Sequence, residues 1–190
     1  MQLILASSSP RRQDLLQEAG YCFESEAPYI DEWDSTTHPD LSAIDLALAN
    51  AQRKAQKVAE HRQDAVVLAA DTIVYCDGKV LGKPEDQGEA KKMLRLLNGK
   101  THEVITAMAW FETAKNFMRR CVDKTYVTFR NLSEEDIDFY LGKVHVLDKA
   151  GGYAVQEHGE EIIERIEGSR TNVIGLPMER LQEWWDDLGV

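Results

Sequence analysis

Hydrophobic and polar positions along the chain separate short apolar runs from amphipathic segments. The first apolar run, residues 3–6, leads into a polar turn, and an amphipathic segment begins at Pro10. This order predicts a buried strand followed by a helix, with Ser9 as the N-cap residue and Pro10 in the first helical position. Gly20 is a suitable residue to end that helix.

The next segments predict a second helix and a strand that is covered on both faces. Residues 42–60 carry an apolar stripe at helical spacing, and Lys54 lies beside or within it. The stripe comprises Ile44, Ala47, Leu48, Ala51, Ala55 and Val58. Residues 65–70 are all apolar, as is typical of a strand covered on both faces, and Asp71 follows directly. We therefore expect Asp71 beyond the strand end, where ligands of α/β proteins commonly bind.

Turn signals and apolar runs predict the remaining elements. The acidic stretch at 29–42 predicts a surface loop, and Asp77-Gly78 is typical of a hairpin turn. The other predicted elements are a return strand at 79–81, a helix at 85–97, strands at 102–111 and 119–129, a capped helix from Ser133, a glycine-rich segment at 148–156, a strand at 162–166 and a helix at 178–188. Hairpins imply antiparallel pairs, so we expect one elongated α/β domain with a mixed sheet over residues 1–190.

Composition narrows the classes of partner. The 190 residues carry a net charge of −11, which argues against binding to a nucleic-acid polymer but leaves a nucleotide open, because a small polyanion needs only a local basic pocket. Three widely spaced cysteines form no metal-binding spacing and favour a reduced, cytoplasmic setting. No apolar run is long enough to span a bilayer and no secretory signal is recognisable, so we expect no membrane contact.

The turn before the first helix is the first candidate site. Ser7, Ser9, Arg11 and Arg12 could form a phosphate cradle with the backbone N–H groups of the helix N-terminus. Two arginines in a first helical turn run against the usual preference for acidic residues, and a bound phosphate would explain them. The alternative is a capped helix with two solvated arginines, and this segment alone supports both readings equally.

Charged residues further along the chain are individually weaker candidates. Asp71 could be a general base for a water molecule or a ligand for Mg²⁺ or Mn²⁺, although a lone aspartate is more often a turn or cap residue. Lys54 could extend to the surface, which is the commoner fate of such a lysine. Lys83 lies in the stiff turn Gly82-Lys83-Pro84 and could meet a phosphate. Thr72 is by itself more often an ordinary strand residue.

The glycine-rich segment is a candidate for base recognition. Tyr153 could stack on a base, and the Gln156 carboxamide carries both a donor and an acceptor that could read a base edge. An ordinary loop with a packed tyrosine is the alternative. Glu32 is a further carboxylate whose sequence surroundings decide little.

Taken together and in order, these segments resemble the Maf family of nucleoside triphosphate pyrophosphatases over nearly the whole chain. The matching blocks are Ala6–Arg12, Lys54-Ala55, Ala70–Thr72, Gly82–Pro84, Asp123–Thr125, Asp148–Gly151 and Gly175–Pro177. Within the family, Arg11, Thr72 and Gln156 resemble the branch that acts on dTTP and UTP. A departure is Gly152–Gln156, where relatives commonly read Ala-Tyr-Gly-Ile-Gln, and the exchange of glycine and alanine could alter the local backbone.

The resemblance implies an ITPase-like elongated, two-lobed fold with a bent mixed sheet and a nucleotide cleft. It also implies hydrolysis of dTTP and UTP between the α and β phosphates, with a divalent cation, Mg²⁺ or Mn²⁺, and a role in removing non-canonical nucleotides. Asp71 matches the family's proposed proton acceptor, with Lys54 and Lys83 as further catalytic positions. Asp71 and Glu32 are the expected metal ligands, and a homodimer is a further expectation. A non-catalytic nucleotide-binding module and a pyrophosphatase for modified nucleotides are the rival hypotheses.

Overall fold

A mixed sheet forms the centre of the protein. The structure, a computed structural model, describes residues 2–187. Within them the strands are β1 (Gln2–Ala6), β2 (Phe23–Glu26), β3 (Ala65–Cys76), β4 (Lys79–Leu81), β5 (Thr101–Glu112), β6 (Phe117–Phe129) and β7 (Ile163–Glu167). They are arranged in the order β2-β1-β3-β5-β6-β7, and β4 pairs with β3 outside this order. β1 is parallel to β2 and β3, whereas the other pairs are antiparallel, which confirms the predicted mixed sheet.

Five helices begin and end close to the predicted positions, and two short helices, at residues 159–162 and 170–174, were not predicted. They are α1 (Pro10–Glu18), α2 (Ala43–Ala59), α3 (Gln87–Leu97), α4 (Glu134–Lys143), α5 (Gly159–Ile162), α6 (Arg170–Ile174) and α7 (Met178–Asp187), with a 3₁₀ turn, η1, at Ala150–Gly152. Local caps explain several boundaries: Ser42 accepts a hydrogen bond from the Asp45 amide, and Ser133 and Asp136 form a full capping box. Leu188, predicted as the end of the last helix, lies outside the described residues.

Two sequence predictions about α2 and β3 are corrected. Ile44 is 36% exposed and does not belong to the buried stripe of α2. The apolar run at 65–70 is only the first half of a strand that continues to Cys76, so Asp71 lies in the middle of β3 and not beyond its end. The strand continues because β5 pairs with it without interruption from Val66 to Tyr75. A buried carboxylate is tolerated at this central position because it is paired, as described below.

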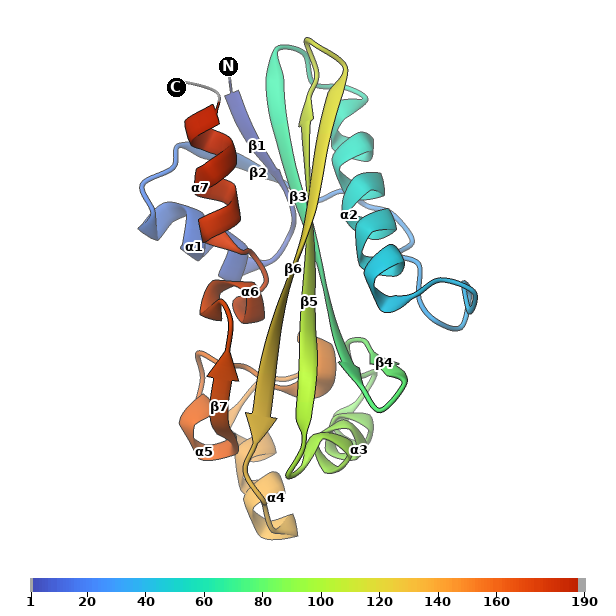
Figure 1. The fold of residues 1–190 in the computed structure, drawn as a ribbon, viewed down its shortest axis with the longest axis vertical. Coiled ribbons are helices and arrows are strands. Elements are labelled where there is room, and N and C mark those ends of the chain that lie inside the picture. Colours follow the sequence, from blue (N-terminus) through green and yellow to red (C-terminus); the bar gives the residue numbers. More distant parts are fainter. Residues whose placement is uncertain (1, 188–190) are drawn as a thin grey trace.

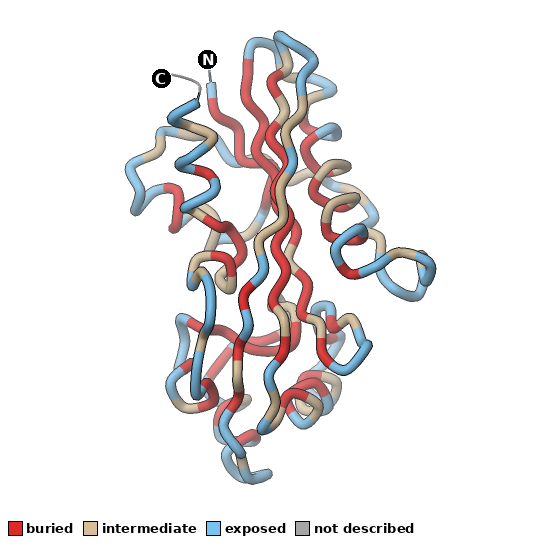
Figure 2. Tube along the Cα trace, in the orientation of Figure 1, coloured by how far each residue is buried: buried red, intermediate tan, exposed pale blue. Residues whose placement is uncertain are grey.

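The molecule is elongated, with two groups of helices at the two ends of the long strands β3, β5 and β6 (Figure 1). At one end, α2 covers one face of the sheet, and α1 and α7 lie on the opposite side. At the other end lie α3, α4, α5 and the short strand β4. The buried residues follow the central strands through both ends (Figure 2). Within the described residues, no helix is long and apolar enough to cross a membrane.

The alternation of side chains along β3 places the residues of the site. Val67 and Ala69 pack in the core beneath α2, whereas Leu68 and Ala70 pack in the core with α1 and α7. Successive strand residues point to opposite faces, so every second residue lies on the same face. Asp71 therefore faces α2, and Thr72 faces α1.

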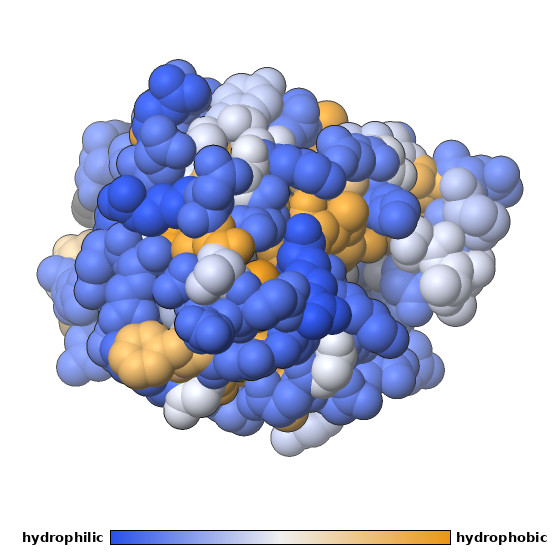
Figure 3. Space-filling view, turned by 90° about the horizontal axis from the view of Figure 1, so that it is seen from below, coloured by the Kyte–Doolittle hydropathy of each residue, from blue (hydrophilic) through white to orange (hydrophobic). Residues whose placement is uncertain are grey.

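The surface is largely hydrophilic where it is seen from the end that carries α3 and α4 (Figure 3). Small apolar patches interrupt it. On α4, the Phe139 side chain is exposed, and the Lys143 ammonium lies 3.8 Å from its ring centroid. The predominance of polar surface agrees with the high charge content of the chain.

Candidate active site

A cavity of about 450 Å³ lies between the two ends of the molecule. Segments that are far apart in the sequence line it: the turn before α1, the loop before α2, the inner face of α2, the centre of β3, the turn after β4 and the glycine-rich segment. All eleven residues singled out in the sequence line this cavity, namely Ser7, Ser9, Arg11, Arg12, Glu32, Lys54, Asp71, Thr72, Lys83, Tyr153 and Gln156. The fold therefore gathers the phosphate-cradle, carboxylate and base-recognition candidates in one place.

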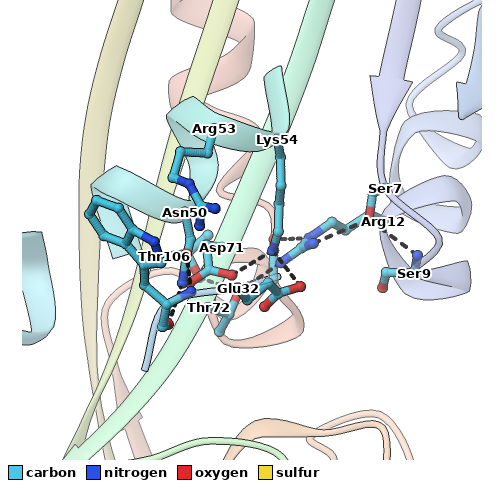
Figure 4. Close-up of polar contacts among 12 residues, drawn as sticks. Ser7, Ser9, Arg12, Glu32, Asn50, Arg53, Lys54, Asp71, Thr72 and Thr106 are labelled. Carbon is cyan, nitrogen blue, oxygen red and sulfur yellow. Dashed lines mark hydrogen bonds and ion pairs between the residues drawn. The ribbon is translucent and has the colours of Figure 1, made fainter. Parts of the chain in front are cut away.

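A buried ion pair lies at the centre of the cavity. The Lys54 ammonium is 2.6 Å from Asp71 Oδ1 and 3.1 Å from Glu32 Oε1 (Figure 4). The side chains of Lys54 and Asp71 are only 6% and 8% exposed, whereas that of Glu32 is 43% exposed. Lys54 therefore does not extend to the surface. It points from α2 towards the centre of β3, where one ammonium serves two carboxylates.

The environment shifts the proton affinities of both carboxylates. Burial raises the pKa of Asp71, and Glu32 raises it further, although Lys54 and Arg12 act in the opposite direction. For Glu32, burial alone would raise the pKa, but the charges of Lys54 and Lys83 outweigh burial and lower it. Asp71 thus binds a proton more readily than an ordinary aspartate, which is the direction that suits a group accepting a proton during a reaction.

Arg12 is fixed by three different elements. Its Nε donates to the Gly175 carbonyl at 2.8 Å, and its two terminal nitrogens donate to Ser7 Oγ at 3.2 Å and Thr72 Oγ1 at 3.1 Å. Thr72 in turn shares a hydrogen bond of 3.0 Å with Thr106 on β5. Burial lowers the pKa of Arg12, while Asp71 and Glu32 favour its charged form. The guanidinium is thus a partly buried positive charge that acts on both carboxylates.

The N-terminus of α1 adjoins this cationic group. Ser9 is at the predicted N-cap position, but its hydroxyl makes no capping hydrogen bond. Its backbone N–H instead donates to Ser7 Oγ at 3.1 Å. The first turn carries no acidic residue. Unpaired N–H groups and the positive end of the helix dipole at such a terminus favour an anion.

Arg11 reaches across the cavity to the glycine-rich segment. Its guanidinium forms an ion pair with the Asp148 carboxylate and donates a second hydrogen bond, of 3.2 Å, to the Asp148 carbonyl. Burial alone would raise the pKa of Asp148, but hydrogen bonds from Arg11 and Lys149 outweigh it and lower the pKa to about 2. The reading of Arg11 and Arg12 as two solvated arginines is therefore wrong, because both are held by partners 137 and 163 residues away.

The glycine-rich segment closes the other side of the cavity. Gln156 is exposed on its lining, as is Lys83 in the turn after β4. Tyr153 is 5% exposed, its hydroxyl is 2.8 Å from His102 Nε2, and its ring packs edge-on against Phe129. Tyr153 is therefore a packed core residue, and Gln156 remains the group of this segment that is free to meet a base.

Sequence reasoning missed Asn50 and Trp33. Asn50 is 2% exposed on the inner face of α2, one turn before Lys54. Its carboxamide contacts both the Trp33 backbone and Asp71. The signal that could have found it is the helical spacing: a second polar residue lies four positions before Lys54 on an otherwise apolar stripe.

The carboxylates fit a divalent cation that is also held by substrate. Among residues 2–187, no group of three or more His, Cys, Asp or Glu side chains is arranged to hold a metal ion. Asp71 and Glu32 nevertheless contact the same ammonium, and the charge of Glu32 raises the pKa of Asp71. Carboxylate oxygens are hard ligands, and Mg²⁺ commonly takes one or two of them together with substrate phosphate oxygens. Asp71 and Glu32 line one cavity with the N-terminus of α1, so the site has the carboxylates for such a cation.

Comparison with known proteins defines first the fold and then the family. The fold resembles that of the Ham1 protein of Staphylococcus aureus, with a TM-score of 0.56 and 14% identity over 98% of this chain and 99% of that one. Residues 2–188 match the family described as Maf-like protein. The chain therefore belongs to the Maf family.

Two curated relatives carry the same name, dTTP/UTP pyrophosphatase. The protein from Akkermansia muciniphila is 44% identical over 98% of this chain and 96% of its own length. The protein from Bacillus cereus strain ZK is 44% identical over 95% of this chain and 92% of its own length. The likeness thus extends over nearly the full length of all three chains.

Proposed function

We propose that this protein is a nucleoside triphosphate pyrophosphatase that hydrolyses dTTP and UTP to the monophosphate and pyrophosphate. The observation that carries the proposal is the buried Lys54–Asp71 pair beside Arg12 at an anion-binding helix terminus, in one cavity with Gln156. The names of relatives at 44% identity support the same activity and the same substrates.

The positive groups of the cavity would bind the triphosphate. The N-terminus of α1, Arg12 and Lys83 lie on its walls, and each attracts phosphate oxygens. Because Arg12 is held by Ser7, Thr72 and Gly175, its charge is fixed in place before substrate arrives. Such preorganisation stabilises charge that develops as pyrophosphate leaves. Arg11 would join the cradle by exchanging Asp148 for a phosphate.

Asp71 would orient a water molecule and accept its proton as the water attacks the α-phosphorus. Its raised pKa makes it a better proton acceptor than an ordinary aspartate. Lys54 favours the charged form of this carboxylate and orients it through a contact of 2.6 Å. A divalent cation held by Asp71 and Glu32, either Mg²⁺ or Mn²⁺, would neutralise charge on the phosphates.

Gln156 would recognise the base. Thymine and uracil present a carbonyl, an imide N–H and a second carbonyl along one edge, and a carboxamide offers a complementary donor and acceptor. Gln156 is exposed and lines the same cavity as Arg11 and Arg12 of α1. Its place on the glycine-rich segment supports this role.

Product analysis tests the reaction directly. Purified protein would be incubated with dTTP, UTP, CTP, dCTP, GTP and 7-methyl-GTP, each with Mg²⁺ or Mn²⁺. We expect monophosphate and pyrophosphate from dTTP and UTP. Diphosphate with orthophosphate would refute the cleavage site, and binding without turnover would favour a non-catalytic nucleotide-binding module.

The role of Asp71 is tested by Asp71→Asn, which keeps the shape of the side chain and removes its charge. We expect turnover to fall by at least about a hundredfold, the low end of general-base effects. The matched control is Asp77→Asn in the β3–β4 turn, whose exposed carboxylate pairs with Lys100 outside the cavity. Near-normal turnover of folded Asp71→Asn protein would contradict the assignment.

A further inference from the structure

A buried side chain of α2, Asn50, binds the backbone of the loop that carries Glu32. Residues 27–34 have no regular secondary structure, so the hydrogen bonds of a sheet or helix do not fix their position. Asn50 Oδ1 accepts a hydrogen bond of 2.8 Å from the Trp33 backbone N–H, and Asn50 Nδ2 donates one of 2.8 Å to the Trp33 carbonyl. The residue directly before this doubly bound backbone is Glu32.

The same carboxamide also faces the catalytic carboxylate. Asn50 Nδ2 donates a longer hydrogen bond, of 3.3 Å, to Asp71 Oδ2, on the side of Asp71 away from Lys54 (Figure 4). The orientation of the amide is not free, because only Oδ1 can accept from the Trp33 N–H and only Nδ2 can donate to the Trp33 carbonyl. The backbone of the loop therefore dictates that an N–H group points at Asp71.

We propose that Asn50 is a positioning residue that fixes the separation of Glu32 and Asp71 and so prepares them to share one divalent cation. The inference rests on the proposed function, which assigns those carboxylates to the cation. Metal ligands work when groups behind them hold their orientation, and loss of such a partner typically weakens metal binding by about 10- to 100-fold. Asn50 is placed to do this for two ligands at once, from a rigid helix.

The other contacts of the loop explain why removal of the Asn50 side chain should affect only the site. The Arg53 guanidinium donates to the Asp31 carbonyl at 2.8 Å and lies 4.7 Å from the centroid of the Trp33 ring. The ring also stacks on His38 at 3.9 Å. The contacts with Arg53 keep the outer side of the loop on α2 when Asn50 is removed. What is lost is the fixed position of the backbone next to Glu32.

The variants Asn50→Ala and Asn50→Gln test the proposal. The first removes the carboxamide, and the second keeps it but displaces it by one methylene. Calorimetric titration with Mn²⁺, in the presence of a dTTP analogue with nitrogen in place of the α–β bridging oxygen, measures cation affinity without turnover. We expect the dissociation constant to rise by about 10- to 100-fold in both variants. Hydrogen exchange of the peptide containing Trp33 should become faster.

The chain offers a matched control in Asn98. Its carboxamide makes the same two-way contact with a backbone, accepting from the Leu132 N–H at 2.7 Å and donating to the Leu132 carbonyl at 2.9 Å. It lies after α3 and does not line the cavity. Asn98→Ala should lower thermal stability in the way a purely structural asparagine does, and leave the Mn²⁺ affinity unchanged.

Repeating the titration in a protein that already carries Glu32→Gln shows whether Asn50 acts through Glu32. If it does, Asn50→Ala should lower the Mn²⁺ affinity less when Glu32→Gln is already present than in the wild type, because coupled residues are not additive. Equal losses in both backgrounds, or an unchanged Mn²⁺ affinity in either folded Asn50 variant, would overturn the proposal. These titrations need no hydrolysis, so absence of dTTP and UTP turnover in the wild type would refute the proposed function separately.

Discussion

Removal of the Lys54 charge is expected to destabilise the protein in a way that depends on pH. Lys54→Met keeps most of the apolar side-chain volume but leaves Asp71 without its partner at 2.6 Å. Both side chains of this pair are less than 10% exposed, and breaking such a buried pair costs about 3–5 kcal/mol. The contact with Glu32 adds less than about 1 kcal/mol, because Glu32 is 43% exposed.

Other groups near Asp71 place the expected loss of folding stability near the lower end of that range. Arg12 still favours the charged form of Asp71, and Asn50 still donates a hydrogen bond to it. We therefore expect about 3 kcal/mol at pH 8, which corresponds to a fall in Tm of about 6–12 °C for a chain of this size. Added Mn²⁺ should recover part of the loss, because a cation can replace the ammonium between the carboxylates.

The pH dependence of this loss follows from the direction in which the pKa of Asp71 is shifted. Without Lys54, burial of Asp71 is opposed by less positive charge, so its pKa in the folded variant lies even further above that of the unfolded chain. A buried carboxyl of raised pKa is tolerated while it is protonated and becomes destabilising as the pH rises above the unfolded value. The difference in stability between wild type and Lys54→Met should thus grow from acidic to alkaline pH.

Chemical denaturation at several pH values measures this difference. The control is Lys57→Met on the same helix, because Lys57 pairs with Glu60 through side chains that are 48% and 61% exposed. That pair should contribute no more than about 0.5 kcal/mol at any pH. An equal effect of the two variants, or a loss in Lys54→Met that grows as the pH falls, would refute the reasoning.

Two further predictions concern the glycine-rich segment and the core beside it. Gln156→Glu should lower kcat/KM for dTTP and UTP by at least about tenfold, or 1.4 kcal/mol, with little change in Tm; unchanged kinetics would remove Gln156 from base recognition. Burial lowers the pKa of His102 from 6.5 to about 4, so the stability present above pH 6.5 is lost as the pH falls towards 4, by about 3 kcal/mol. His102→Gln should flatten this part of the stability profile, measured by denaturation, and an unchanged slope would contradict the assignment.

Much of the local structure could be predicted because its causes are local. Ser42 and Ser133 cap the helices that follow them through hydrogen bonds spanning three residues. The turn at Asp77 and Gly78 has φ of 48° and 79°, values that these two residue types adopt more readily than others. The limits of α2 likewise follow from a cap and a stripe that lie within its own segment. Neighbours in the sequence carry all the necessary information in these cases.

The position of Asp71 could not be predicted in the same way. A run of apolar residues that ends at a carboxylate has the pattern of a strand end, and local sequence alone gives no reason to continue it. β5 decides the matter, because its residues pair with β3 on both sides of Asp71. The Lys54–Asp71 contact then makes the buried carboxylate tolerable. Both β5 and Lys54 lie in other parts of the chain, so the sequence around Asp71 does not reveal them.

The sequence by itself determined most of the elements, the ordered motifs and the chemical types of the site residues, because caps, turns and periodicity act over a few positions. Only the tertiary structure decided how those residues meet: Arg11 with Asp148, Arg12 with Gly175, and Asn50 with the backbone of Trp33. These contacts join positions 17 to 163 residues apart. They form only when the sheet brings distant segments together, and the burial that results is what shifts the pKa of Asp71 and fixes the charges of the site.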